Sequence, residues 1–229
     1  MVRPKLSSQG GQEQGLERER VVREALSLLN EVGFSGLTLR RVAERLHVQA
    51  AALYWHFKDK QDLIDAMTAD VILREFREHP LAETEWRPLL AEFANLNRHA
   101  LTRYRDGAQL IAHAYMPQDR MLEGMEYLLT ALIKQGFSAE LAIASFFSIV
   151  RFTLGCVFEE QSDPRTTRPA IDKKAARAKL KQLADPYPTV SKIFSEVIAT
   201  RGTGMSEWQF AAGLAILLDG IAIQLDAGL

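Results

Sequence analysis

The sequence has one cysteine and no long uninterrupted apolar run, and both absences exclude classes of protein. The single thiol, Cys156, cannot form an intrachain disulfide or a thiolate metal cluster, and its apolar surroundings favour a packed core residue. The two most apolar stretches, Leu141–Phe158 and Phe210–Leu225, are interrupted by Arg151 and Asp219, so neither predicts a membrane span. No apolar segment follows the basic residues near the start, so no signal peptide is expected. These features predict an intracellular, cytoplasmic protein without a membrane partner.

The chain also lacks a strong excess of either charge. Its 229 residues are 47% apolar and 25% charged, with a net charge of −1, which gives no overall attraction to polyanions. The charge is uneven, however. Residues 1–60 carry ten Lys/Arg against seven Asp/Glu, a net +3, and the remainder carries eighteen against twenty-two, a net −4. A mildly basic N-terminal part on an acidic body would orient the protein towards DNA, although so small an excess only supports that interpretation.

Motifs for catalysis are missing as well. The chain has no Ser-His-Asp order, no glycine-rich phosphate loop and no pair of carboxylates in a plausible pocket. An enzymatic function is therefore not expected.

What the sequence does contain is helical periodicity. No segment alternates as a strand does and no repeat is visible, so we predict an all-α protein. Residues 1–15, rich in Gly, Gln and Ser, are expected to be a disordered arm, and the alternative is an arm whose Arg3 and Lys5 touch DNA. We expect an N-terminal three-helix unit at 16–63 and a helical ligand-binding and dimerisation domain at 64–229. The expected helices are 16–31, 60–78, 87–103, 106–115, 120–135, 139–158, a short basic helix at 172–183, 189–200 and 206–226.

Residues 37–60 predict a helix-turn-helix, the motif that DNA-binding proteins insert into the major groove. Thr38 can cap a short helix whose apolar positions share one face, and His47 stands at the turn, where a left-handed residue is needed. A second helix starts at Gln49 and has a nearly bare outer face, since Ala50, Ala51 and Ala52 follow. The alternative is an ordinary pair of core helices.

The aromatic cluster after this helix weighs against that alternative. Tyr54, Trp55, His56 and Lys58 bring phenol, indole, imidazole and ammonium donors to one helix end, as phosphate contacts require. A long helix then opens at an Asp59 cap and carries Lys60 in its first turn, where the charge adds to amide donors facing a phosphate. Because this helix would join the two domains, tilting it would move the recognition helix.

At these residues the sequence resembles the tetracycline-repressor (TetR) family, and in particular its tetracycline-binding branch. The similar segments run in the family's order and spacing from about Leu16 to Gln161: Ala25–Phe34, Gly36–Thr38, Leu53–Lys58 with Lys60, Arg105–Ala108, Gln135–Ser138 and Phe152–Val157. The resemblance implies an N-terminal helix-turn-helix DNA-binding domain and a helical ligand-binding and dimerisation domain.

For DNA recognition, the resemblance assigns base contacts to Arg40 and to the start of the recognition helix. It assigns phosphate contacts and anchoring to Thr38, Tyr54, Trp55, His56 and Lys60. The branch carries Gln-Pro-Thr where this chain has Ala50, Ala51 and Ala52, whose methyl groups can touch thymine methyls but cannot hydrogen-bond a base. The operator is therefore expected to differ, and Gln49 becomes a candidate base reader by proximity.

For the ligand, the same comparison predicts that most polar contacts of the branch have been lost. Its magnesium-drug chelate is held by a histidine where this chain has Ile111, and Glu159 matches the one acidic position that is retained. A lone carboxylate does not predict a metal site, and His113 is interpreted as a core or pocket residue rather than a metal ligand. We expect a bulky, largely apolar ligand other than tetracycline, and no cofactor. The predicted lining residues are Phe76, Phe93, Asn97, Ile111, His113, Tyr115, Leu128, Phe152 and Glu159.

One stripe of the last helix contains Gly213, Leu217, Gly220 and Gln224, with Ala212, Ala215 and Ile216 nearby. The small residues among them would let another helix approach closely. The resemblance pairs this helix with 139–158 in a four-helix dimer interface, and packing within one subunit is the alternative. A homodimer would match a palindromic double-stranded operator.

Together these features predict a homodimeric repressor that a small hydrophobic effector releases from DNA. Ligand in the body would shift the 106–115 helix, which pushes the 60–78 helix and moves the recognition helices. Two other functions remain open: a carrier or enzyme for the same ligand, and an activator on the same fold.

Overall fold

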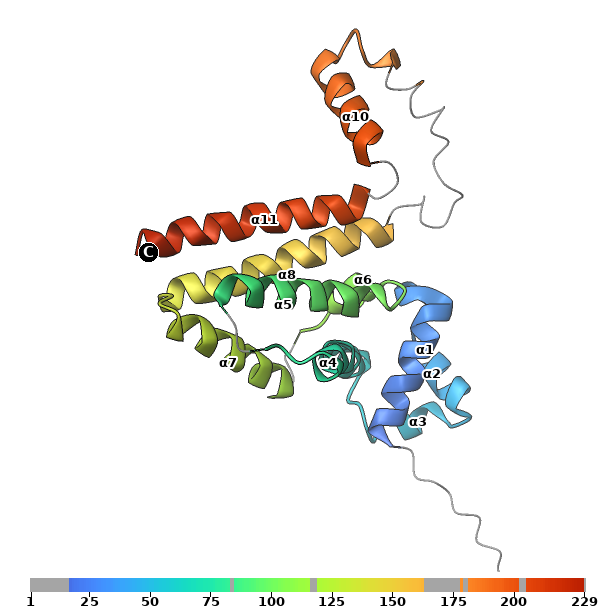
Figure 1. Cartoon of the computed structure of the whole chain (residues 1–229). Coiled ribbons are helices and arrows are strands. Elements are labelled where there is room, and N and C mark those ends of the chain that lie inside the picture. Colours follow the sequence, from blue (N-terminus) through green and yellow to red (C-terminus); the bar gives the residue numbers. More distant parts are fainter. Residues whose placement is uncertain are drawn as a thin grey trace, which may run out of the picture.

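The computed structural model describes residues 17–82, 85–115, 119–162, 178, 181–201 and 205–228, and every regular element within them is a helix (Figure 1). The prediction of an all-α protein is confirmed. The expected arm at 1–15 and most of the expected 172–183 helix lie outside the described residues. The helices are α1 Arg18–Gly36, α2 Leu39–Leu46, α3 Ala50–Leu53, α4 Lys60–Glu78, α5 Trp86–Thr102, α6 Gly107–Ala112, α7 Asp119–Lys134, α8 Ala139–Ser162, α10 Pro188–Arg201 and α11 Met205–Asp226.

Helices α1 to α3 form a compact unit, here called the head, around the first turns of α4 (Figure 1). Its core includes Leu29, Leu37, Leu53 and Phe57, each 1% exposed or less. The predicted turn chemistry is confirmed. The Thr38 hydroxyl accepts a hydrogen bond from the Arg41 amide at 3.3 Å, and His47 ends α2 in the left-handed region at φ 58°.

Helix α1 extends further than the sequence predicted. Gly33 adopts the positive φ of 72° expected of a helix cap, but one more helical turn follows it and α1 ends at Gly36. Only glycine fits at this position, because a Cβ atom there would lie 2.7 Å from Oδ2 of Asp106. The kink thus lets the loop before α6 approach the end of α1 closely.

Helix α4 has the predicted bounds and connects the head to the other helices, here called the body. The Asp59 carboxylate accepts a hydrogen bond from the Asp62 amide at 2.9 Å, as expected of an N-terminal cap. The first half of α4 supplies Leu63 and Met67 to the core of the head, and Phe76 near its other end packs on the core of the body. A single rigid helix therefore contacts both units.

In the body, α5, α8 and α11 lie side by side, and α7 packs on α8 (Figure 1). Leu89, Phe93, Leu132, Ile149 and Leu214 are among the buried residues between them. Expected and observed bounds differ by one residue for most of these helices, but α8 continues four residues past the predicted end, to Ser162.

The prediction for α6 was wrong in length, because this helix covers only Gly107–Ala112 instead of 106–115. Asp106 is left-handed at φ 56° and so precedes the helix, and the chain leaves it at His113. A Cβ atom at Gly107 would lie 2.2 Å from the Leu101 carbonyl oxygen, so the loop between α5 and α6 is also built around a glycine.

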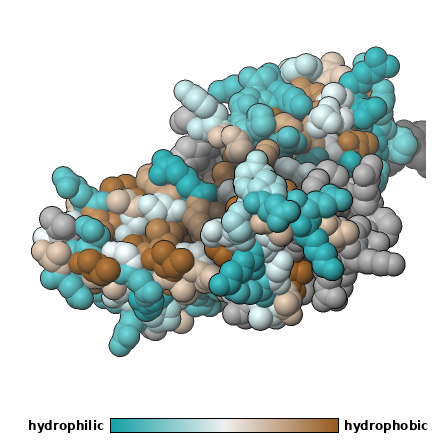
Figure 2. Space-filling model, turned by 90° about the horizontal axis from the view of Figure 1, so that it is seen from above, coloured by the Kyte–Doolittle hydropathy of each residue, from teal (hydrophilic) through white to brown (hydrophobic). Residues whose placement is uncertain are grey.

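Helix α8 and residues 206–226 of α11 are long and apolar enough to span a membrane by length and composition, a test that core helices also pass. Both contribute residues to the core of the body. Both also expose apolar side chains, including Phe158, Ile216 and Ile223. Figure 2 looks down on the molecule from the side of α11 and shows apolar side chains gathered at its surface there.

The predicted stripe on α11 is divided between two environments. Gly213 faces the interior, where a Cβ atom would lie 2.7 Å from the Phe152 ring. Gly220 is exposed, and among the described residues nothing lies within 4 Å of the place where its Cβ would be. Packing within one subunit therefore explains Gly213 but not Gly220.

Candidate DNA interface and ligand cavity

The outer surface of the head presents two aromatic side chains to solvent. Trp55 is 89% exposed and Tyr54 is 58% exposed, whereas their neighbours Leu53 and Phe57 are buried. The buried pair anchors the segment in the core of the head and leaves the indole N–H and the phenol O–H outside. Both are hydrogen-bond donors suited to phosphate oxygens.

The residues expected to contact bases lie on the same unit. Gln49 is exposed and precedes the first residue of α3, and Ala51 is exposed while Ala50 and Ala52 are partly covered. The Arg40 guanidinium is 86% exposed and pairs with Glu44 at 2.9 Å on the same face of α2. An exposed pair of this kind costs little to break, so Arg40 remains available for a guanine edge.

Two other predicted anchors, His56 and Lys60, contact α1. The Lys60 ammonium stands 5.3 Å from the centre of the Phe34 ring, and the His56 carbonyl accepts a hydrogen bond from Arg18 at 3.3 Å. Arg18 also pairs with Asp62 at 2.9 Å, so the start of α4 is held against α1. Lys58, which supplies the ammonium group of the predicted donor cluster, is also exposed.

The body contains a cavity of about 650 Å³ between α4, α5, α6, α7 and α8. Five of the nine residues predicted to line a ligand pocket line it: Phe76, Phe93, Asn97, Ile111 and Tyr115. Most of the other lining residues are apolar. They are Thr68, Ile72, Leu73, Pro80, Leu81, Leu101, Ala114, Met121, Leu122, Gly124, Met125, Tyr127, Phe146, Phe147, Val150, Thr153 and Leu154.

The other four predicted residues are not among those that line this cavity. Leu128 is fully buried in the core of the body, and Phe152 stacks on Phe210 of α11 at 5.5 Å between ring centres. Glu159 is exposed on α8. His113 follows α6 and packs on Phe34 of the head, with 4.6 Å between ring centres. Tertiary packing turns each of these four side chains away from the cavity.

Sequence reasoning also missed the two threonines of the lining. Thr68 and Thr153 are buried, and among the described residues neither hydroxyl has a hydrogen-bond partner. Helical spacing was the available signal, since Thr68 lies two turns before Phe76 on α4 and Thr153 lies two turns after Phe146 on α8.

Helix α6 connects this cavity to α4. Ile111 in its last turn and Tyr115, three residues after its end, both line the cavity. The buried Asp65 carboxylate of α4 accepts hydrogen bonds from the Tyr115 amide at 2.8 Å and from the Gln61 side chain at 3.0 Å. The Gln61 amide also donates to the His113 carbonyl at 2.6 Å. A ligand that displaces the end of α6 would therefore pull on α4.

The start of α6 is bound to the head in the same way. The Asp106 carboxylate accepts a hydrogen bond from the Phe34 amide at 2.8 Å. The Arg105 amide donates to Asn30 at 2.8 Å, and its guanidinium donates to the Glu31 carbonyl at 2.9 Å. These bonds join the loop before α6 to the end of α1.

Gln161 holds the same loop to α8. Its carbonyl oxygen accepts a hydrogen bond from the Ala108 amide at 3.0 Å, and its amide donates to the carbonyls of Leu101 and Tyr104 at 3.1 and 2.9 Å. Helix α6 is thus attached to the head on one side and to a wall of the cavity on the other.

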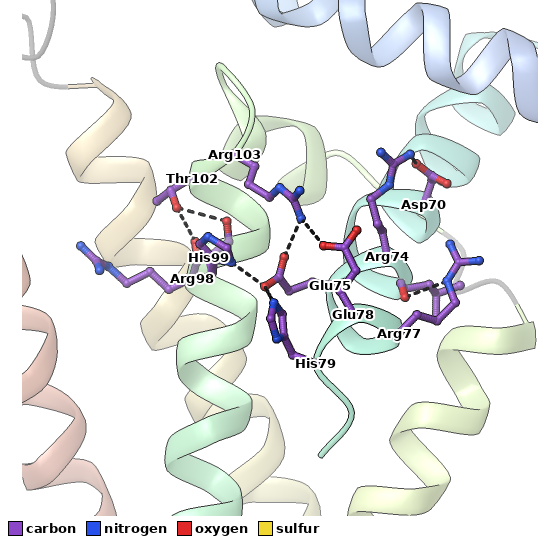
Figure 3. Close-up of polar contacts among 11 residues, drawn as sticks. Asp70, Arg74, Glu75, Arg77, Glu78, His79, Arg98, His99, Thr102 and Arg103 are labelled. Atoms are coloured by element: carbon purple, nitrogen blue, oxygen red, sulfur yellow. Dashed lines mark hydrogen bonds and ion pairs between the residues drawn. The ribbon is translucent and has the colours of Figure 1, made fainter. Parts of the chain in front are cut away.

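An ionic cluster around the buried Glu75 joins the other end of α4 to α5 (Figure 3). The Glu75 side chain has no solvent exposure and lies 2.5 Å from His99 Nδ1 and 3.0 Å from Arg103 Nη1, while Arg103 also pairs with Glu78 at 3.0 Å. Burial raises the pKa of Glu75, but the hydrogen bonds from His99 and Arg103 outweigh it, so the pKa of this carboxyl lies below its usual value. These bonds fix the end of α4 beside the cavity.

Neither a metal site nor a reactive thiol is indicated by the side chains that the structure describes. Those residues contain no group of three or more His, Cys, Asp or Glu side chains that could hold a metal ion. Cys156 is partly buried against the core of the body, and burial, together with the charges of Glu160 and Glu159, raises the pKa of its thiol.

Comparison with known proteins agrees with this arrangement. Residues 21–67 match the N-terminal domain of bacterial regulatory proteins of the TetR family, and residues 79–225 match the tetracyclin repressor-like C-terminal domain. The class A tetracycline repressor from transposon 1721 of Escherichia coli is 37% identical over 212 residues, which are 90% of this chain and 91% of that protein.

Solved structures give the same result. A possible TetR family transcriptional regulator from Streptomyces coelicolor A3(2) is 31% identical with a TM-score of 0.73, covering 90% of this chain and 99% of its own. A class A TetR in complex with 5a,6-anhydrotetracycline and magnesium is 34% identical with a TM-score of 0.64, covering 90% and 98%. The chain, which carries a helix-turn-helix head on a helical body with a cavity, therefore belongs to the TetR family of DNA-binding transcriptional regulators, which are not enzymes.

Proposed function

We propose that this regulator is a repressor that leaves its operator when a bulky, largely apolar molecule enters the cavity. One observation carries the proposal: α6 and the residues just after it line the cavity, those following residues are hydrogen-bonded to α4, and the loop before α6 is hydrogen-bonded to α1. A ligand of this kind has the size and polarity of the cavity.

The DNA-binding residues of this proposal are those on the surface of the head. Gln49 and Arg40 read bases, and the methyl groups of α3 contact thymine. The phosphate contacts and anchoring come from Thr38, Tyr54, Trp55, His56 and Lys60. We place the boundary between the DNA-binding domain and the ligand-binding domain at residue 63, so that α4 starts in one and ends in the other.

The active species is a homodimer on a palindromic operator, and it acts in the cytoplasm, on the nucleoid when it is bound to DNA. Support comes from the exposed apolar residues of α8 and α11, Phe158, Ile216 and Ile223, and from the open surface above Gly155 and Gly220. Among the described residues nothing covers these two glycines within 4 Å, so a helix of a second copy could approach closely.

Tetracycline with magnesium, which a solved relative binds, is not the effector that we propose for this chain. The side chains at the corresponding positions are mainly apolar, and Glu159 is exposed outside the cavity lining. A drug chelate would need more oxygen and nitrogen ligands than the described lining offers.

The test is fluorescence anisotropy with labelled DNA from beside the gene, at a stated salt concentration. Tight binding that weakens with salt and is lost in Tyr54→Ala supports a DNA-binding role for this face. A folded protein that binds no upstream fragment would favour the carrier or enzyme alternative, which turnover of a bound ligand would then decide. A reporter gene in a deletion strain separates repression from activation.

A further inference from the structure

The cavity of this protein has two chemically different ends. Four aromatic rings form a continuous wall at one end: Phe76 lies 5.8 Å from Phe93, Phe93 lies 5.3 Å from Phe146, and Phe146 lies 5.2 Å from Phe147, measured between ring centres. The rings come from α4, α5 and α8, and all four line the cavity. Such a wall favours an aromatic ligand, since rings stack edge to face or offset at these distances.

The opposite end carries the two threonines. Along α4, Thr68 lies eight residues before Phe76, and along α8, Thr153 lies seven residues after Phe146. Since the Phe93 ring contacts both Phe76 and Phe146, these two phenylalanines mark the same end. Both threonines lie at the end near α6, because Leu154, next to Thr153, packs on the same small core as Ile111, and Asp65, one turn before Thr68, bonds the Tyr115 amide. At 1.5 Å per helical residue, the two ends are about 10–12 Å apart.

The threonine hydroxyls are unsatisfied in the protein alone. Thr68 is 2% exposed and Thr153 is 1% exposed, and among the described residues neither Oγ1 has a partner. Buried hydroxyls are normally hydrogen-bonded, and in a helix a threonine can turn its hydroxyl between two staggered positions. Each Oγ1 atom has almost no accessible surface in its present position, so a turn to the other staggered position would bring the hydroxyl to the cavity, where a ligand oxygen would supply the missing bond. Between the two ends, Asn97 donates its amide to the Phe93 carbonyl at 2.7 Å and keeps its own carbonyl oxygen as an acceptor.

Charge is the third constraint on the ligand. None of the described residues that line the cavity is Asp, Glu, Lys, Arg or His. An ionised ligand would lose its hydration without gaining a partner of opposite charge, which is strongly unfavourable.

On the basis of the proposed function, we infer that the effector is an uncharged, elongated aromatic compound with a hydroxyl or carbonyl group at one end. Its rings pack on the wall formed by Phe76, Phe93, Phe146 and Phe147, and its polar end hydrogen-bonds to Thr68 or Thr153. Binding needs no metal ion, because the contacts come from rings and neutral hydroxyls.

Three matched probes test this inference by isothermal titration calorimetry on the whole protein without DNA: 4-hydroxybiphenyl, biphenyl and biphenyl-4-carboxylate, each with EDTA present. We expect 4-hydroxybiphenyl to bind about 3- to 10-fold more tightly than biphenyl, as one neutral hydrogen bond allows, and the carboxylate to bind most weakly. If 4-hydroxybiphenyl and biphenyl bound equally tightly, the inferred hydrogen bond at the polar end would be wrong. If the carboxylate bound most tightly, the inference that the ligand is uncharged would be wrong.

Protein variants locate the contacts. Thr68→Val and Thr153→Val keep the side-chain shape, and at least one of them should remove the advantage of 4-hydroxybiphenyl over biphenyl. Thr130→Val, at an exposed position of α7 outside the lining, is the matched control and should change nothing. Phe93→Leu should weaken both neutral probes. If neither threonine variant changes the ratio of the affinities for 4-hydroxybiphenyl and biphenyl, the assigned threonine contacts are wrong.

The same experiment separates this inference from the proposed function. A protein that binds its operator but none of the probes would contradict the inferred ligand and leave the regulator intact. A protein that binds 4-hydroxybiphenyl as expected but no operator would support the ligand class and contradict the proposed regulation.

Discussion

The carboxylate of Glu75 and the guanidinium of Arg103 join α4 to α5 through an ion pair at 3.0 Å, and the Glu75 side chain has no solvent exposure (Figure 3). His99 adds a second bond at 2.5 Å. Phe76, the next residue of α4, lines the ligand cavity. The pair therefore anchors α4 beside the cavity, while the other end of α4 contacts the head.

Removing the charge of Glu75 should destabilise the protein. Glu75→Gln removes the buried carboxylate that His99 and Arg103 share and leaves Arg103 with Glu78 as its anionic partner. We expect a loss of about 1–3 kcal/mol in the free energy of unfolding, as for charge-assisted hydrogen bonds lost at a buried position. Urea denaturation followed by circular dichroism measures it. Glu78→Gln removes a half-exposed partner of the same Arg103 and should cost less than about 1 kcal/mol. Equal effects of the two substitutions would show that burial of the Glu75 pair does not matter.

The lowered pKa of Glu75 predicts how stability depends on pH. The folded protein binds the proton of this carboxyl less readily than the unfolded chain does, so the stabilisation is complete above the ordinary pKa. It is lost as the pH falls through the lowered value. Urea denaturation at a series of pH values from 7 to 3 should show a steeper loss of stability for the parent protein than for Glu75→Gln. If the free energy of unfolding fell equally with pH in both proteins, Glu75 would not be the source of this pH dependence.

The exposed indole of Trp55 should matter for DNA and not for folding. Trp55→Ala is expected to reduce affinity for the operator at least about tenfold, or about 1.4 kcal/mol, because a phosphate donor is lost. Its melting temperature should stay close to that of the parent, since the side chain is 89% exposed. Tyr187→Ala, at an exposed aromatic residue outside the head, should bind DNA normally in the same anisotropy assay. Normal operator binding by Trp55→Ala would show that Trp55 does not contact the DNA.

Asp65 should transmit the ligand signal from α6 to α4. In Asp65→Asn the hydrogen bonds to Tyr115 and Gln61 lose their charged acceptor, so the coupling between ligand and operator should fall from about 1–3 kcal/mol towards zero. The measurement is the ratio of operator dissociation constants with and without saturating 4-hydroxybiphenyl. Asp70→Asn is the control, because Asp70 pairs with Arg74 on the same helix. An unchanged ratio in Asp65→Asn would place the coupling elsewhere.

A charge on the exposed face of α11 should prevent dimerisation. Ile216 is 73% exposed, and Ile216→Glu would bury an unpaired carboxylate between two copies, so we expect monomers in sedimentation velocity and loss of operator binding. Ile133→Glu, at an exposed position of α7, should leave the parent oligomeric state intact. A dimer that survives Ile216→Glu would mean that another surface forms the interface.

Much of the fold could be predicted from the sequence because its signals are local. The Thr38 and Asp59 caps each bond an amide three residues away, and His47 occupies a backbone region that a tight turn demands. Apolar residues at helical spacing placed α4 with its observed bounds and most body helices within a residue. Within the head, Val42, Ala43 and Leu46 of the predicted apolar face are buried, and the exposed Tyr54 and Trp55 belong to the predicted motif.

Tertiary structure alone decided which side chains meet. Leu128 and Phe152 are as apolar as the lining residues Phe76 and Phe93, but their helix faces point into the core. His113 packs on Phe34, 79 residues earlier in the chain, because α6 ends against α1.

The same holds for the groups with unusual chemistry. The bonds of Glu75 reach 24 and 28 residues along the chain, and the unpartnered hydroxyls of Thr68 and Thr153 stand out only once every neighbour is placed. Local sequence thus determined the helices, their caps and the DNA-facing motif, since these depend on bonds within one or two turns. The cavity and its couplings depend on contacts between distant residues, and packing of the whole chain decided them.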